Sequence, residues 1–121
     1  MVSDRKEQIR RYKETARPMG AFRVRDVAAR RSLVGTSVDL PSMLNRQRFQ
    51  LESGGHADRE LQADWDAKGA DAFVIEVLDT IEPLEEPGYD PTEDLAQLRE
   101  IWAERLLGEG ESLYGKQPDA R

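Results

Sequence analysis

The sequence predicts an α+β domain in which a small three-stranded antiparallel sheet is flanked by helices, with an extra helix at the N-terminus. Two short apolar triplets, Gly20-Ala21-Phe22 and Leu33-Val34-Gly35, have ten residues between them, a spacing typical of two strands joined by a polar turn. Amphipathic stretches with helical spacing and one further apolar run follow. The predicted order of elements is therefore helix, two strands, two helices, strand and helix.

The chain has 121 residues, of which 38% are hydrophobic, and this is enough for one modest core, so we expect a single domain. It contains no cysteine, which excludes disulfides and thiolate metal sites. No apolar run approaches the roughly 18 residues that a membrane-spanning helix needs, and residues 1–13 lack the apolar centre of a signal peptide. We expect a cytoplasmic protein with no membrane partner.

Charge is distributed unevenly along the chain. Residues 1–60 contain 13 Lys and Arg against 8 Asp and Glu, a net charge of +5, whereas residues 61–121 contain 5 against 16, a net charge of −11. A basic half can attract phosphates, but an acidic half and a pI of about 4.9 oppose indiscriminate binding to nucleic acid. Two interpretations stay open: a basic binding face, or two halves that neutralise each other across the fold.

The first elements are a helix and a strand pair. Residues 1–17 form the predicted N-terminal helical extension, a charged surface helix with Ser3 as its N-cap. The first strand, residues 20–27, places apolar side chains on one face and arginines on the other, in the order Phe22, Arg23, Val24, Arg25. A link without the Asn-Gly signal of a tight hairpin leads to the second strand, residues 32–36, which we expect to pair with the first.

Two helices in series follow the strand pair. Asp39 or Ser37 can cap the first, which begins near Pro41 and stops before two glycines. The second spans residues 58–68 and stops at Gly69.

The second half of the chain contains one more strand and one more helix. Residues 72–81 predict a strand with three apolar side chains on one face: Phe73, Ile75 and Val77. Prolines and acidic residues predict an irregular acidic loop over residues 82–93. The last amphipathic helix spans residues 92–107, and residues 109–121 are expected to form a flexible tail.

The two triplets resemble the pair of motifs that name the GIY-YIG nuclease family, with Phe22 and Leu33 in place of the two motif tyrosines. Further similar phrases occur between residue 19 and about residue 106: Val34 to Leu40, Asn45-Arg46, Leu61-Gln62, Trp65, Lys68-Gly69 and Phe73 to Leu78. The leading helix, an Arg-Pro-Met-Gly sequence and an Asn-Arg-Gln-Arg-Phe sequence are similar to a bacterial subgroup of that family. The resemblance implies a GIY-YIG-like domain over residues 18–108.

Family membership implies a specific catalytic set. A tyrosine activates or positions water, an arginine on the first helix stabilises phosphate charge, and a glutamate on the last helix holds one divalent metal, Mg²⁺ or Mn²⁺. Here Phe22, Leu33 and Met43 match the tyrosine and arginine positions, and none of them can carry charge or pass a proton. The match for the metal ligand falls on Arg99 or, after a shift of one residue, on Glu100. Glu100 is the candidate catalytic and metal-binding residue if the protein is active, and a solvated helix carboxylate is the alternative.

Six arginines are candidates for contacts with nucleic-acid phosphates. They lie on the first strand pair and the first helix after it: Arg23, Arg25, Arg30, Arg31, Arg46 and Arg48. A solvated charged face is the alternative for all six. The sole histidine, His56, is expected to be a cap or a surface residue, while Trp65, Trp102 and Phe73 are expected in the core because they fall on apolar faces.

The resemblance and the lost motif residues together predict a nuclease-fold protein with degenerate catalytic motifs, which binds a nucleic acid such as DNA, or a partner, without cutting it. One alternative is an active Mg²⁺- or Mn²⁺-dependent DNA endonuclease with displaced groups, which would use Glu100 and Arg46. The other is a protein-interaction or assembly module that binds a protein partner through the acidic loop 82–93 or an apolar cleft. No cofactor is expected unless the protein is catalytically active.

Overall fold

The computed structural model describes residues 17–115, which form a four-stranded sheet in the order β3-β1-β2-β4. The strands are β1 (Met19–Asp26), β2 (Arg31–Ser37), β3 (Phe73–Ile81) and the short β4 (Ser112–Leu113). β1 pairs antiparallel with β2 and with β3, whereas β4 pairs parallel with β2. The predicted α+β class and the three antiparallel strands are confirmed, and the sheet is mixed because it gains a fourth strand.

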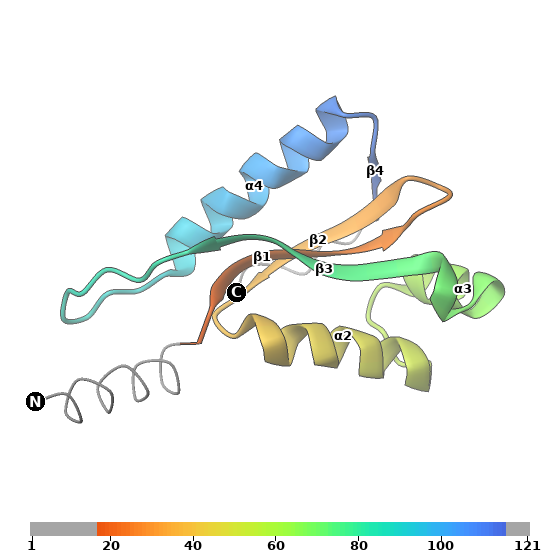
Figure 1. Ribbon diagram of the computed structural model, residues 1–121, viewed down its shortest axis with the longest axis horizontal. Coiled ribbons are helices and arrows are strands. Elements are labelled where there is room, and N and C mark those ends of the chain that lie inside the picture. The colour runs from red at the N-terminus through yellow and green to blue at the C-terminus, as the bar shows by residue number, and fades with distance from the viewer. Residues whose placement is uncertain (1–16, 116–121) are drawn as a thin grey trace, which may run out of the picture.

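Helices cover both faces of this sheet (Figure 1). α2 (Leu40–Ser53) and α3 (Arg59–Lys68) lie on one face, and the 3-10 turn η1 (Ala70–Ala72) leads from α3 into β3. α4 (Thr92–Gly108) lies on the other face, against β1 and β2. The predicted order of strands and helices after the N-terminal extension is confirmed, and the predicted N-terminal helix itself lies outside the described residues.

Local capping residues determine where the two helices on the first face begin and end. Asp39 is the N-cap of α2 and accepts a hydrogen bond from the Ser42 amide at 3.3 Å, while Gly54 ends the helix in the left-handed region at φ 84°. Asp58 caps α3, because its carboxylate accepts hydrogen bonds from the backbone amides of Glu60 and Leu61, both at 3.1 Å. These helix boundaries are therefore determined by capping residues at the helix ends.

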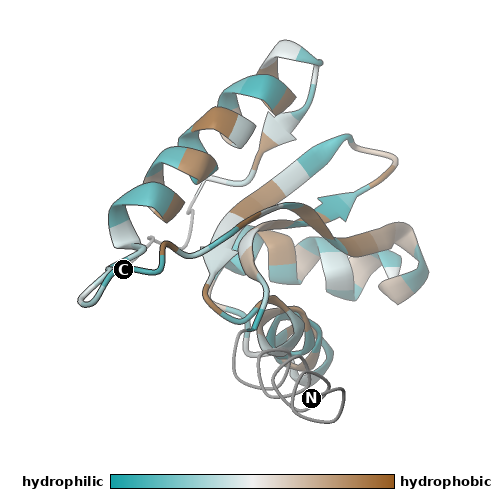
Figure 2. Cartoon of the chain, turned by 60° about the vertical axis from the view of Figure 1, so that its left-hand side comes forward, coloured by the Kyte–Doolittle hydropathy of each residue, from teal (hydrophilic) through white to brown (hydrophobic). Residues whose placement is uncertain are grey.

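The main core lies between the sheet and the α2–α3 pair. Hydrophobic residues, coloured brown in Figure 2, recur along the strands and on the helices. The rings of Trp65 and Phe73 pack at a centroid distance of 5.3 Å, which confirms both as core residues. The other buried members come from both strands of the first hairpin, both helices and the segment after α4: Phe22, Val24, Leu33, Leu40, Leu51, Leu61 and Tyr114.

A second apolar layer forms where α4 covers the opposite face. It buries three leucines that recur at helical spacing: Leu95, Leu98 and Leu106. Trp102 is only half-buried, and its indole Nε1 donates to the Asp79 carboxylate at 3.2 Å at the surface. The expectation that Trp102 is a core residue is therefore wrong, because the indole lies at the margin of this layer.

β3 is an edge strand with an irregular register. Phe73 is buried and Ile75 packs against the core as predicted, but Val77 is 42% exposed. A β-bulge lies beside it, since the pairing of β1 with β3 shifts between Ala21 and Phe22. An alternation rule applied to residues 72–81 cannot locate such a shift.

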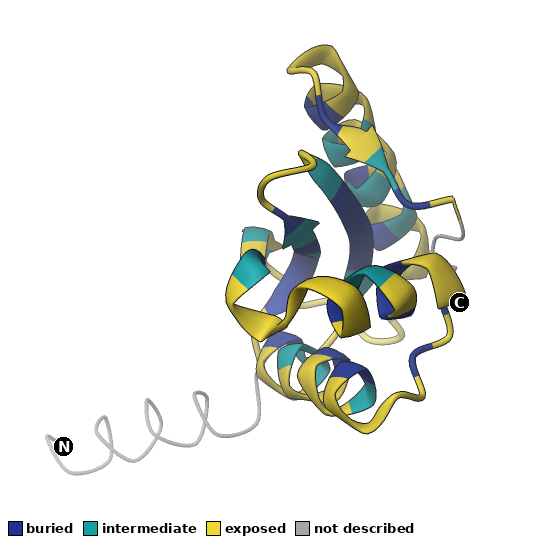
Figure 3. Cartoon of the chain, turned by 90° about the vertical axis from the view of Figure 1, so that its right-hand side faces the viewer, coloured by how far each residue is buried: buried dark blue, intermediate teal, exposed yellow. Residues whose placement is uncertain are grey.

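The segment expected to be a flexible tail is ordered over residues 109–115. Its backbone donates from the Ser112 amide to the Arg30 carbonyl at 2.8 Å and from the Tyr114 amide to the Ser32 carbonyl at 2.9 Å. Glu111 and Tyr114 are both buried in it. Figure 3 shows how the buried positions line the inner sides of the sheet while the outer sides of the helices are exposed. The segment lacks apolar periodicity, so only its distant partners reveal it as a strand.

Candidate nucleic-acid interface

The two positions matched to motif tyrosines lie in the core. Phe22 is 1% exposed and Leu33 is fully buried, both within the cluster that packs under α2 and α3. In the sheet register Phe22 lies opposite Gly35, and Leu33 lies opposite Val24. Both side chains therefore serve packing, and neither can present a polar group to a substrate.

Met43, matched to the family arginine, lies in the second turn of α2 beside a small cavity of about 180 Å³. Its sulfur accepts a hydrogen bond from Gln47 Nε2 at 3.4 Å. The cavity has a mixed polar lining: Ser37, Asp39, Ser42, Met43 and Arg46. Arg46, one turn further along α2, lines the same cavity as Met43.

On α4, the two candidate positions for the metal ligand face different directions. Arg99 follows the buried Leu98 and is half-buried, with a buried Nε that makes no hydrogen bond within the described residues. Glu100 is exposed, because two residues beyond Leu98 correspond to a turn of about 200° around the helix axis. The sheet separates α4 from α2, so Glu100 and Arg46 do not come together (Figure 1).

Two of the predicted phosphate-binding arginines form ion pairs on the α4 side of the sheet. Arg23 donates through Nε to Glu76 Oε2 at 2.7 Å. Arg25 forms a bidentate pair with Glu111, with Nε–Oε1 and Nη2–Oε2 distances of 3.0 and 2.9 Å. Neither guanidinium is free in this conformation.

The two arginines at the hairpin turn are also engaged within the fold. Arg30 Nη2 donates to the Glu109 backbone carbonyl at 2.9 Å. Arg31 donates to Glu60 Oε1 at 2.9 Å and lies over the Tyr114 ring, 4.1 Å from its centroid. For the hairpin, the structure favours the interpretation that basic and acidic parts of the chain neutralise each other.

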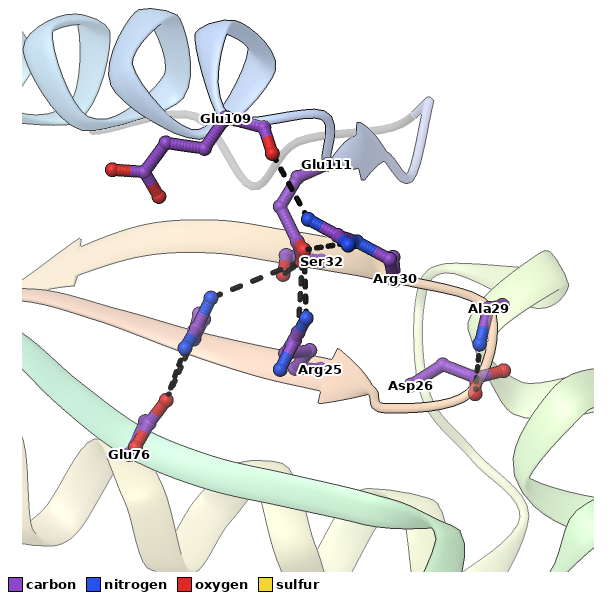
Figure 4. Close-up of polar contacts among 9 residues, drawn as sticks. Arg25, Asp26, Ala29, Arg30, Ser32, Glu76, Glu109 and Glu111 are labelled. Atoms are coloured by element: carbon purple, nitrogen blue, oxygen red, sulfur yellow. Dashed lines mark hydrogen bonds and ion pairs between the residues drawn. The ribbon is translucent and has the colours of Figure 1, made fainter.

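Glu111 is the centre of this network (Figure 4). Besides the two hydrogen bonds from Arg25, its carboxylate accepts one from the Ser32 hydroxyl at 2.8 Å. The guanidinium groups of Arg23 and Arg30 each lie 3.8 Å from it. Burial raises the pKa of the Glu111 carboxyl, but the hydrogen bonds from Arg25 and Ser32 and the charges of Arg25 and Arg23 outweigh it, so the pKa is lowered overall. Glu111 is therefore a carboxylate at neutral pH.

Arg46 and Arg48 differ from the hairpin arginines. Both are exposed on the outer side of α2 and make no hydrogen bond or ion pair with the residues between 17 and 115 that the structure describes. Phe49 lies beside them and is 69% exposed. All three side chains are exposed on the solvent side of the helix, here called the α2 outer face (Arg46, Arg48 and Phe49). Phe49 points away from the core, and the two arginines flank it on opposite sides, because residues two apart are turned by about 200° around the helix axis.

Comparison with known proteins identifies the fold. No protein-family model matches the sequence, and no curated protein does. The solved catalytic domain of homing endonuclease I-TevI superimposes with a TM-score of 0.62 at 17% identity, covering 81% of this chain and 99% of that chain. A glutamate-to-alanine mutant of the catalytic domain of intron endonuclease I-TevI gives a TM-score of 0.61 at 16% identity, covering 84% and 99%. The chain has the GIY-YIG nuclease fold.

Members of the GIY-YIG family generally require a divalent metal, so the side chains must be tested for a metal site. Within the described part of the chain, no three Asp, Glu, His or Cys side chains come close enough to hold a metal ion. Glu100 is exposed and belongs to no group of three potential ligands among the described residues, and the neighbouring position that faces the sheet is the cation Arg99. The residues present do not fit the family metal.

The sole histidine is part of the loop between α2 and α3. His56 is buried, its Nδ1 accepts the Asp58 amide at 3.0 Å, and its Nε2 lies 2.6 Å from Gln47 Oε1. Burial lowers the pKa of His56, although the Asp58 charge opposes this effect. The expectation of a cap or a surface residue is wrong: Asp58 is the N-cap of α3, and His56 is a buried loop residue whose ring has two polar partners inside the protein.

Sequence reasoning missed two residues of this domain, the exposed Phe49 and the buried Glu111. Phe49 could have been found, since it is two residues before Leu51 and so falls opposite the apolar side of α2. Glu111 could not, because its partners lie 79 and 86 residues earlier in the chain.

In the described residues, no helix is long and apolar enough to cross a membrane.

Proposed function

We propose that this protein is a nucleic-acid-binding domain that keeps the GIY-YIG nuclease fold without its catalytic set. The observation that carries the proposal is the α2 outer face, where Arg46, Arg48 and Phe49 are exposed together and the two arginines have no acidic partner among the described residues. Arg46 also lines the cavity beside Met43. Guanidinium groups bind phosphate oxygens, and an exposed aromatic ring provides a surface on which a base can stack.

The loss of catalysis is supported at each matched position. Phe22 and Leu33 are packed in the core, and Met43 supplies a thioether where an arginine is needed. The alternative of an endonuclease that uses Glu100 with Arg46 lacks geometric support, because the sheet lies between α4 and α2.

Binding should depend on the α2 outer face. We expect fluorescence anisotropy with a labelled single-stranded DNA at low salt to detect binding by the wild type, and the double substitution Arg46→Gln with Arg48→Gln to weaken it. Since each phosphate contact adds about one to the slope of log affinity against log salt, the double variant should lose roughly two from that slope.

Arg105→Gln is the matched control, because Arg105 is exposed on α4, across the sheet, where it lies 4.6 Å from the Trp102 ring centroid. It removes a positive charge without touching α2 and should leave the slope unchanged. Equal affinity for the double variant and the wild type would overturn the assignment of this face.

A protein-binding role is the second candidate function. It is favoured by exposed apolar side chains on the free edge strand and in the acidic loop: Val74, Val77 and Leu84. No binding of the wild type to DNA or RNA at low salt would support this alternative.

A further inference from the structure

A single carboxylate collects an unusual set of donors on the α4 side of the sheet. Glu111 accepts two hydrogen bonds from Arg25 and one from Ser32, and the guanidiniums of Arg23 and Arg30 both lie 3.8 Å from it. Figure 4 shows Arg25, Ser32 and Arg30 pointing toward Glu111 from two strands and the turn between them. Three cations and a hydroxyl group around one anion form a built anion site.

The chemistry of this site fits phosphate as well as carboxylate. A guanidinium presents parallel N–H groups that match two oxygens of either anion, and a phosphate group offers more acceptor oxygens than one carboxylate does. Of the three cations, Arg23 also pairs with Glu76 at 2.6 Å, so two acidic groups face three basic ones. The cluster keeps an excess of positive charge with Glu111 in place.

The segment that brings Glu111 into the site is short and lies at the edge of the sheet. β4 is two residues long and pairs with β2 at the sheet edge, with its backbone held at Arg30 and Ser32. Its one large anchor is Tyr114, which is fully buried and donates to Asp64 at 2.8 Å. Short peripheral segments such as this open at lower free energy than the core of a domain.

We propose that Arg23, Arg25, Arg30 and Ser32 form a second phosphate-binding site, which Glu111 occupies as an internal mimic of phosphate. The β4 segment (residues 109–115) masks this site, and a nucleic-acid phosphate group competes with Glu111 for it. Ser32 is fully buried and the Arg23 and Arg25 side chains are 17% and 24% exposed, so the site is accessible only when the segment moves. This inference rests on the proposed function for its biological ligand, whereas the anion site itself does not.

The test compares Glu111→Gln with Glu109→Gln in the full chain. Both substitutions remove one negative charge from the same segment, but the Glu109 side chain points away from the cluster and only its backbone carbonyl accepts from Arg30 (Figure 4). The probes are pyrophosphate, followed by isothermal titration calorimetry, and a labelled single-stranded DNA, followed by anisotropy. The two probes separate a free phosphate ligand from the nucleic-acid backbone.

We expect Glu111→Gln to bind both probes at least severalfold more tightly than Glu109→Gln does. Its salt slope for DNA should increase by one to three, one for each arginine that becomes available. Adding Arg25→Gln to the Glu111→Gln protein should reverse the gain. Equal affinities for the Glu111 and Glu109 variants would overturn the inference.

If Glu111→Gln does not fold, a second variant tests the same inference. Tyr114→Phe removes the hydrogen bond to Asp64 while it leaves Glu111 and the arginines intact, and it should also raise affinity for both probes. Failure of this inference differs from failure of the proposed function. Wild-type binding that depends on Arg46 and Arg48, with no effect at Glu111 or Tyr114, would overturn only the masked site. Binding gained at Glu111 without any dependence on Arg46 and Arg48 would overturn only the α2 outer face.

Discussion

Two buried carboxylates show how individual residues shape this domain. Asp26 is fully buried and pairs with Lys68, and Glu111 pairs with Arg25 and Ser32. A buried charge without a partner is strongly destabilising, so each pair ties distant segments of the chain together. The same property makes the Arg25 site selective, because only an anion can replace Glu111 there.

The pH dependence of stability should report on His56. Burial lowers its pKa below the ordinary value, so as the pH falls below about 6.5 the unfolded chain takes up the proton before the folded one does. The stability that the neutral His56 ring contributes is therefore fully present above that pH. It is lost as the pH falls toward the lowered pKa of the folded state, by up to about 1.4 kcal/mol per pH unit.

Urea unfolding between pH 7.5 and 5.5 measures this slope, in a window that lies above the titration of Glu111, whose pKa is lowered. His56→Gln should be less stable at pH 7.5 but should lack that slope. Parallel pH profiles for the two proteins would show that the ring does not titrate as its burial implies.

At the scale of elements, β1 is the strand around which the domain is organised. It pairs with β2 on one side and β3 on the other, and it supplies Phe22 to the core under α2 and Arg25 to the cluster under α4. Gly20 lies near the start of β1, next to the bulge, where the backbone of β3 comes close to it. Any side chain at that position would collide with a neighbouring strand.

Gly20→Ala should therefore destabilise the protein. A Cβ atom would overlap the Asp79 carbonyl oxygen and lie 2.7 Å from the Thr80 Cα, and backbone atoms of a paired strand cannot move aside easily. We expect the free energy of unfolding in urea to fall by about 1–3 kcal/mol, as for other overpacked sites.

The control is Gly108→Ala at the end of α4, where nothing lies within 4 Å of the added atom. This change should be neutral or stabilise the protein by up to about 1 kcal/mol, because alanine favours helix more than glycine does. A loss of stability at Gly108 as large as that at Gly20 would contradict the steric explanation.

At the scale of the whole molecule, the charged halves meet across the sheet. The basic hairpin pairs with carboxylates from the second half, Glu76 and Glu111, so much of its charge is neutralised in the folded protein. The α2 outer face retains its positive charge on the opposite side. The fold thus separates a free basic surface from a masked one.

Catalysis in a nuclease requires groups from several elements at one place, and here the sheet separates Glu100 on α4 from Arg46 on α2 (Figure 1). We expect wild-type protein to leave supercoiled plasmid intact in the presence of Mn²⁺, and Glu100→Ala to behave identically, since Glu100 is exposed on the far side of the sheet from Arg46. Gel electrophoresis of the plasmid measures nicking. Mn²⁺-dependent nicking by the wild type that Glu100→Ala abolishes would contradict the loss of catalysis.

The elements whose signals are local could be predicted from the sequence. Alternation of apolar residues and arginines predicted β1, and Asp39, Gly54 and Gly69 marked the ends of α2 and α3. The substitutions at Phe22 and Leu33 were also visible, because a motif is a short run of residues. Capping, turn chemistry and strand alternation act over a few residues, so a linear reading can recover them.

Which charges remain free depends on contacts between segments that are distant in the sequence. Arg25 and Arg46 read alike as exposed arginines near a motif, yet one is held by Glu111, 86 residues away, and the other faces solvent. The fourth strand, the bulge beside Val77 and the buried state of His56 were hidden for the same reason. An ion pair or an edge strand depends on which segments meet in space, and no local pattern in this chain encodes those meetings.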